Sequence, residues 1–201
     1  MTRQKTHKIF PVPVFEYKVE NYNEFNVELE KYIYNLKKKD EKGLTASNVG
    51  GWHSPFFNIA ESDLLKKFLN TIHKYLFEII TNDFGLKYKI EKTKIDGMWS
   101  IINPKNTFNI RHNHANSFLS AAYYVKAKKD SGKIKFFDPK EQRVVNAPFV
   151  EKVTDLSAVA LNFEPEEGKL LIFPSYLHHA VSKNLSHEDR IVISFNINID
   201  K

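Results

Sequence analysis

Cysteine is absent from this chain of 201 residues. Its absence excludes disulfide bonds, thiolate metal sites and cysteine nucleophiles, so nitrogen and oxygen atoms are the ligands available to a bound metal. Glycine and proline are also scarce, with seven and eight residues, and this excludes a low-complexity chain or a long flexible linker. The sequence therefore predicts a single domain over residues 1–201, large enough to bury one substantial core.

Long apolar runs are missing as well. No stretch approaches the ~20 apolar residues that a membrane-spanning helix needs, and residues 1–8 are polar and basic, unlike a secretory signal. We therefore expect a soluble, cytoplasmic protein without a membrane partner.

Charge is close to balanced, because 30 Lys and Arg face 24 Asp and Glu and leave a net charge of +6. The lysine runs at 37–39 and 126–133 accompany no nucleic-acid recognition motif, so we interpret them as solvated surface. A nucleic-acid partner is not indicated, and the sequence leaves a homodimer open.

Apolar spacing predicts helices first and strands afterwards. Apolar residues recur at helical spacing over 23–39 and again from a cap at Ser62 to about Asp83, where Gly85 ends the helix. Residues 9–17 carry prolines that suit an edge strand, and the glycine-containing loop 41–55 is a candidate rim for a site. Further strands are expected near 87–92, 96–103, 107–114, 117–126, 132–137, 157–163, 169–173, 178–183 and 189–199. This order indicates an α+β fold with helices packed on one sheet, and the polar segment 138–156 is the best candidate for a mobile insert over a site.

His112 and His114 are the most informative pair in the chain. Alternate side chains of a strand share a face, so both imidazoles can point into one cavity and bind a divalent transition metal. A third ligand must come from a distant strand, and the segment 173–181 offers His178 and His179. Because eight histidines are present, an H-x-H pair alone arises easily, and its context decides its meaning.

That context is a series of ordered sequence blocks. They read as a Trp that opens a strand, N-x-x-H-x-H, S-x-x-Y-Y-V, G-x-I-x-F-x-D-P, G-x-L-x-x-F-P-S-x-L-x-H-x-V and R-I-x-I-S-F-N, at Trp99, 109–114, 120–125, 132–139, 168–181 and 190–196. In this order they resemble the Fe(II)- and 2-oxoglutarate-dependent oxygenase superfamily, and in particular its H-x-H…H variant from marine bacteria and their phages. The resemblance covers 99–198, about half of the chain.

The resemblance implies a fold and a reaction. The fold would be a double-stranded β-helix, or jelly roll, over 86–201, supported by the helical N-terminal part, 1–85. The chain would be a non-heme iron oxygenase that takes dioxygen, decarboxylates 2-oxoglutarate to succinate and carbon dioxide, and hydroxylates an unidentified substrate.

The resemblance also implies a ligand set. The superfamily holds Fe(II) by a His, a carboxylate two residues later and a distal His, which places the ligands here at His112, His114 and His179. His179 rather than His178 aligns with the family's H-x-V. The imidazole of His114 replaces the usual carboxylate, which leaves the iron with one more positive charge. An alternative pair, His114 and Asn116, has the same spacing but offers a poor amide ligand.

Further positions are assigned to 2-oxoglutarate. Its far carboxylate needs a buried cation, for which Arg190 is the candidate, and Ser194 shares a face of the last strand with Arg190. Tyr124 keeps the parity of Ser120 and faces the interior, where its hydroxyl can donate to the same carboxylate. A surface ion pair of Arg190 with Asp189 or Glu188 is the competing interpretation.

The substrate side is predicted by Trp52, His53 and Phe56 in the loop, for which a hydrophobic loop anchor is the alternative. Asn109 is a further candidate, although it stands out of parity with His112 unless its strand bulges. Trp99, Phe136 and Phe173 are expected to be core aromatics. Two other functions stay open. One is a three-histidine, cupin-like metal dioxygenase that uses no 2-oxoglutarate, and the other is a non-catalytic jelly-roll binding module.

Overall fold

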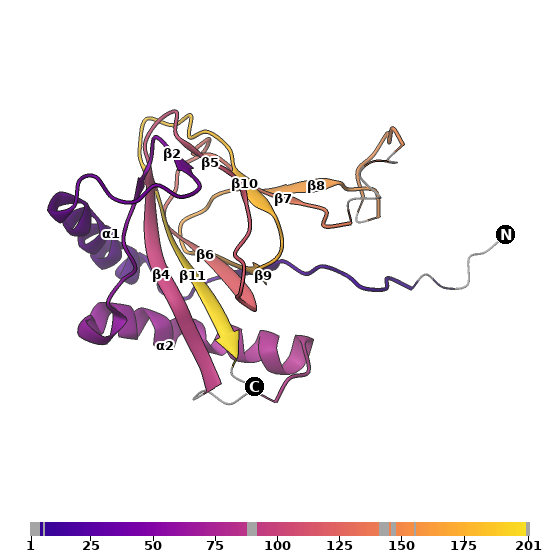
Figure 1. Cartoon of the computed structure of the whole chain (residues 1–201), viewed down its shortest axis with the longest axis horizontal. Coiled ribbons are helices and arrows are strands. Elements are labelled where there is room, and N and C mark those ends of the chain that lie inside the picture. The colour runs from indigo at the N-terminus through magenta and orange to yellow at the C-terminus, as the bar shows by residue number, and fades with distance from the viewer. Residues whose placement is uncertain are drawn as a thin grey trace.

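The chain folds into two β-sheets with helices against one of them, as seen in a computed structural model (Figure 1). The structure describes residues 5, 7–87, 92–140, 145, 148–154 and 156–199. Its helical elements are α1 (Tyr22–Lys39), η1 (Ile59–Glu61), α2 (Asp63–Glu78) and η2 (Ile79–Asp83). Its strands are β1 (Phe15–Lys18), β2 (Asn48–Val49), β3 (Trp52–His53), β4 (Thr93–Asn103), β5 (Phe108–His112), β6 (Leu119–Lys126), β7 (Ile134–Phe137), β8 (Ala160–Phe163), β9 (Lys169–Pro174), β10 (His179–Val181) and β11 (Arg190–Ile199).

The helices lie close to their expected bounds. In α1 the buried side chains of Phe25, Leu29 and Ile33 follow at four-residue steps and form one apolar face. The Ser62 hydroxyl accepts from the Leu65 backbone N–H at 3.3 Å and caps α2, which continues into the π-type turn η2 before Gly85. None of the helices within the described ranges is long and apolar enough to cross a membrane.

The large sheet has the strand order β1-β9-β6-β11-β4-β3, and β1 lies at its edge as expected. One face of this sheet meets the helices. The rings of Phe68 in α2 and Tyr123 in β6 have centroids 4.8 Å apart, and the Tyr123 hydroxyl donates to Asn26 Oδ1 in α1 at 2.7 Å. Alternate residues of β11, among them Ile191 and Ile193, are buried in the same core.

The small sheet has the order β2-β5-β10-β7-β8. It lies on the side of the large sheet away from α1 (Figure 1), and it carries His112 in β5 directly opposite His179 in β10. The other face of the large sheet, with Tyr124 and Arg190, looks toward this sheet across a cavity. The fold thus places His112, His179 and Arg190 around one cavity.

Two segments expected from the sequence lie partly outside the described residues. The strand expected near 87–92 lies largely outside the described residues. Part of the segment 138–156 lies outside the described residues as well, and its described residues include the fully exposed Phe149. None of its described residues lines the cavity, and a cover over the site stays a prediction.

Candidate functional site

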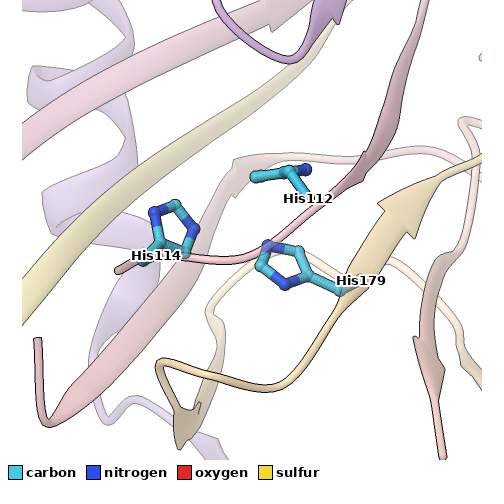
Figure 2. A group of neighbouring side chains, drawn as sticks. All are labelled: His112, His114 and His179. Carbon is cyan, nitrogen blue, oxygen red and sulfur yellow. The ribbon is translucent and has the colours of Figure 1, made fainter. Parts of the chain in front are cut away.

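His112, His114 and His179 converge on one point. Each offers one ring nitrogen, and these three atoms lie within 4.8 Å of one another. Figure 2 shows the rings turned toward a common space from two chain segments. His112 ends β5 and His179 begins β10, while His114 lies just past β5, where its backbone N–H donates to Ser175 O at 2.9 Å.

Backbone carbonyls fix two of these rings. His112 Nδ1 lies 2.8 Å from Ile110 O and His179 Nδ1 lies 3.0 Å from Leu177 O. A carbonyl oxygen can only accept, so each Nδ1 must carry the proton and donate. In the neutral ring this leaves Nε2 as the free lone pair, which is the usual arrangement of a metal-binding histidine.

Burial keeps the triad neutral. It is the largest cause that lowers the pKa of His114 to about 4 and of His179 to about 3, and the neighbouring histidines lower both further. The pKa of His112 is lowered by burial as well. Three neutral imidazoles near neutral pH form a donor set that suits iron and other first-row transition metals.

The alternative pair of His114 with Asn116 does not fit this geometry. Asn116 is exposed in a left-handed turn with φ 65°, and its backbone oxygen accepts from Asn198 Nδ2 at 2.9 Å. It is not among the residues that line the cavity, whereas His114 is.

The triad opens into a cavity of about 620 Å³ between the two sheets. Arg190, Ser194 and Tyr124, the residues assigned to the cosubstrate, line it together with Asn109. Trp52 does not: it is buried in the helix-side core, and its indole N–H donates to Asp40 O at 2.7 Å. The position of Trp52 fits the alternative of a hydrophobic loop anchor, while His53 and Phe56, the other loop candidates, do line the cavity.

Arg190 lines this cavity and is almost fully buried, with 1% of its surface exposed. Its Nη1 donates to Ser131 O at 2.9 Å and to Gly132 O at 3.0 Å, and its Nη2 donates to Asn103 Oδ1 at 2.7 Å. Its Nε has no hydrogen-bond partner among the described residues. Burial lowers the pKa of Arg190 to about 10, so the guanidinium stays charged at neutral pH.

The competing surface ion pairs of Arg190 are not formed. Asp189 accepts from the Tyr34 hydroxyl at 2.8 Å, and Glu188 lies within 3.6 Å of Lys126. Arg190 makes no ion pair with any carboxylate in the described part of the chain. A buried cation thus faces the cavity without an anionic partner.

Tyr124 and Asn109 complete the polar wall. Burial is the main cause that raises the pKa of Tyr124 to about 12, and the nearby charge of Arg190 opposes this shift. The pairing of β5 with β10 shifts register between His112 and Asn109, and this bulge brings Asn109 onto the face of His112 despite the odd spacing.

Trp99 is buried, as expected of a core aromatic. It also lines the cavity, which the sequence did not predict. Its ring stacks on His53, with centroids 5.8 Å apart and planes 9° apart, and lies 5.5 Å from the His114 ring. Phe173 lines the cavity too, while Phe136 packs in the small core beside His179.

Sequence reasoning also missed Asn103. Trp99, Ile101 and Asn103 alternate along β4 and all line the cavity. Trp99 pairs with Ser194 and Asn103 pairs with Arg190, so the register of β4 against β11 would have placed both on the face of the predicted cosubstrate residues.

One protein family and several solved structures are similar to this chain. A family model described as "Putative 2OG-Fe(II) oxygenase" matches residues 97–196, whereas no curated protein sequence matches the chain. A prolyl-4-hydroxylase from Pseudomonas putida aligns with TM-score 0.66 and 13% identity over 94% of each chain.

Two further solved structures are similar. HygX from Streptomyces hygroscopicus, with nickel, 2-oxoglutarate and hygromycin B bound, has TM-score 0.65 and 9% identity over 94% of this chain and 83% of that one. A Trichoplax adhaerens prolyl hydroxylase, in complex with a hypoxia inducible factor peptide, has TM-score 0.63 and 14% identity over 92% of this chain and 83% of that one. At such low identity these similarities show a shared fold.

Proposed function

Because the chain belongs to the Fe(II)- and 2-oxoglutarate-dependent oxygenase superfamily, we propose that it hydroxylates a substrate yet to be identified. In this reaction one atom of dioxygen enters a C–H bond of the substrate, the other enters succinate, and 2-oxoglutarate loses carbon dioxide. The observation that carries the proposal is the histidine triad, whose ligand atoms lie within 4.8 Å of one another in the cavity that also contains the uncompensated Arg190.

The triad supplies the metal ligands. His112, His114 and His179 would hold Fe(II) through neutral ring nitrogens, and the carbonyls of Ile110 and Leu177 orient two of the rings. Bound Fe(II) supplies open coordination positions and the redox chemistry by which dioxygen reacts with a 2-oxo acid. The protein contributes a fixed ligand geometry and a largely apolar wall that limits access of water.

The cosubstrate would lie between the histidine triad and Arg190. Its far carboxylate would accept from the Arg190 guanidinium, whose Nε is unpaired. Tyr124, whose hydroxyl makes no hydrogen bond with described residues and stays protonated because its pKa is raised, would donate to the same carboxylate. Ser194 lines this part of the cavity on the Arg190 face of β11 and would add a further donor.

The rest of the wall favours an uncharged substrate group. Among the described residues that line the cavity, Arg190 is the only Lys, Arg, Asp or Glu, and a buried charge is costly without a partner. The aromatic side chains of His53, Phe56 and Trp99 and the amide of Asn109 would contact the substrate near the metal.

We further propose the domain arrangement. Residues 86–201 would form a double-stranded β-helix core, and residues 1–85 would support it as part of one domain. The mutual packing of Phe68 and Tyr123, one from each part, supports this arrangement.

Anaerobic titration with Fe(II) and then 2-oxoglutarate tests the proposed function. We expect the weak visible charge-transfer absorption of a 2-oxo acid chelated to Fe(II), and slow succinate formation when oxygen is admitted. His179→Ala should lower the metal affinity by more than the roughly 10–100-fold that loss of an outer-sphere partner costs. His178→Ala, a change at the half-buried neighbour outside the cavity lining, is the matched control.

The rival functions predict other results. A three-histidine dioxygenase would bind the metal without the absorption band, and Arg190→Ala would leave its activity unchanged. A non-catalytic module would form no succinate. Metal binding that survives His179→Ala would contradict every function based on the triad.

A further inference from the structure

The hydrogen-bond partners of Arg190 are all uncharged. Its guanidinium donates to two backbone carbonyls and to one side chain, Asn103 Oδ1, at 2.7 Å. Asn103 is itself 1% exposed and stands directly opposite Arg190 in the β4–β11 register. Among the described residues Arg190 thus has one side-chain partner, and that partner is an amide rather than a carboxylate.

The orientation of this amide is fixed by its surroundings. Thr107 Oγ1 donates its single proton to Pro104 O at 2.8 Å, so it must accept from Asn103 Nδ2, 3.2 Å away. The Asn103 backbone oxygen accepts from Asn184 Nδ2 at 2.8 Å. Asn103 therefore presents Oδ1, and not Nδ2, to the guanidinium.

Gly132 lies directly against the Arg190 guanidinium. A Cβ atom at this position would lie 2.6 Å from Arg190 Nη1 and would also collide with Ser182 O, and the backbone here has φ +99°. Glycine therefore allows the chain to approach the guanidinium closely enough for Gly132 O to accept from it at 3.0 Å.

These contacts hold the guanidinium in place but leave its charge unbalanced. A buried cation without an anion is unfavourable, and an incoming carboxylate relieves that cost. An aspartate at position 103 would instead neutralise Arg190 from within the protein, and the far carboxylate of the cosubstrate would then meet a net charge of zero.

We propose that Asn103 is a positioning residue that aims the Arg190 guanidinium while keeping it unneutralised, and that it thereby makes the cavity selective for 2-oxo acids with a second carboxylate. This inference rests on the proposed function, since it assumes that the triad metal and Arg190 bind the two ends of one cosubstrate. It adds a residue that contributes to selectivity without being charged.

Calorimetric titration of the Ni(II)-loaded protein with two 2-oxo acids tests the proposal. 2-Oxoglutarate carries the second carboxylate and 2-oxobutyrate lacks it. Asn103→Asp should weaken 2-oxoglutarate binding at least tenfold and change 2-oxobutyrate binding less than twofold. Asn103→Asp also removes the hydrogen bond from Asn103 Nδ2 to Thr107 Oγ1, so circular dichroism is recorded to show that the variant is folded. A purely structural role would weaken the binding of both ligands together.

Two further variants separate charge from orientation. Asn103→Ser keeps the site neutral but has a shorter side-chain acceptor. It should therefore weaken 2-oxoglutarate binding while the protein still prefers 2-oxoglutarate to 2-oxobutyrate. Asn109→Asp adds the same charge to the same cavity at a residue that bonds to Ser47 and not to the guanidinium, and it should reduce the preference much less than Asn103→Asp does.

The failures of the two proposals can be told apart. If wild-type protein binds neither acid, the proposed function fails and this inference fails with it. If wild-type protein prefers 2-oxoglutarate and Asn103→Asp keeps that preference within twofold, or Asn109→Asp removes it equally, the inference about Asn103 alone is overturned.

Discussion

At the scale of single residues, the histidine triad couples the site to the stability of the fold. Burial lowers the pKa of His114 to about 4 and of His179 to about 3, whereas both titrate near their ordinary value of about 6.5 in the unfolded chain. Between these pH values the unfolded chain binds more protons than the folded chain. The free energy of unfolding must therefore fall as the pH falls below about 6.5.

Urea unfolding of the metal-free protein in a chelator, from pH 7 to pH 5, measures this effect. Well below pH 6.5 each such histidine contributes a slope approaching ~1.4 kcal/mol per pH unit. His179→Gln carries no titrating ring and should reduce the slope. An equal slope in both proteins, or stability that rises on acidification, would contradict the buried neutral triad.

Residue parity predicted part of the site and missed the rest. The resemblance to the oxygenase superfamily indicated Arg190, and period-two spacing then placed Ser194 on the face of Arg190 and Tyr124 on the face of Ser120. Trp99 and Asn103 face the cavity because of the register between β4 and β11, which is a long-range property that local spacing does not contain. Trp52 and His53 were both expected on the substrate side, but only His53 lines the cavity, because neighbouring residues of a strand point to opposite faces.

At the scale of elements, neighbouring side chains of β6 point to opposite faces of the large sheet and have different roles. Tyr123 faces the helices, where its hydroxyl donates to Asn26, and Tyr124 faces the cavity near Arg190. Tyr123→Phe should lower the free energy of unfolding by about 1–3 kcal/mol, because it leaves Asn26 buried without this partner. Tyr124→Phe should weaken 2-oxoglutarate binding by about three- to tenfold, as loss of one hydrogen bond to a charged group implies, with little change in stability.

Urea unfolding and calorimetric 2-oxoglutarate titration on both variants check this division, and each variant serves as the control for the other. If both substitutions reduce stability alike and neither changes cosubstrate binding, Tyr124 does not contact the cosubstrate.

Element boundaries were predicted best where the pattern is local. Helical spacing and the Ser62 cap placed α1 and α2 within a few residues, because apolar periodicity and capping act over one turn. The π-type turn η2 and the bulge of β5 carry no local pattern. His114 was expected within a strand but lies beyond the end of β5, and it is held there by a hydrogen bond to Ser175 from a distant segment.

At the scale of the whole molecule, the large sheet joins two environments. Its helix-facing side chains, such as Ile191 and Phe195, belong to the main core, while Leu171 and Phe173 on the other face belong to the smaller core beside the triad. The same strands therefore support both the helices and the cavity. Loss of either packing layer exposes one face of β6, β9 and β11, so the two layers should unfold together.

The two tryptophans report on these environments separately, because Trp52 lies in the helix-side core and Trp99 lines the cavity. We predict a single cooperative transition in urea. Fluorescence of Trp99 in Trp52→Phe, and of Trp52 in Trp99→Phe, should each coincide with the circular dichroism curve of the same variant, with free energies of unfolding that agree within ~10–15%. Helical signal that is lost at lower urea than Trp99 fluorescence would mean that residues 1–85 and 86–201 form two units. In that case the helices would not stabilise the site.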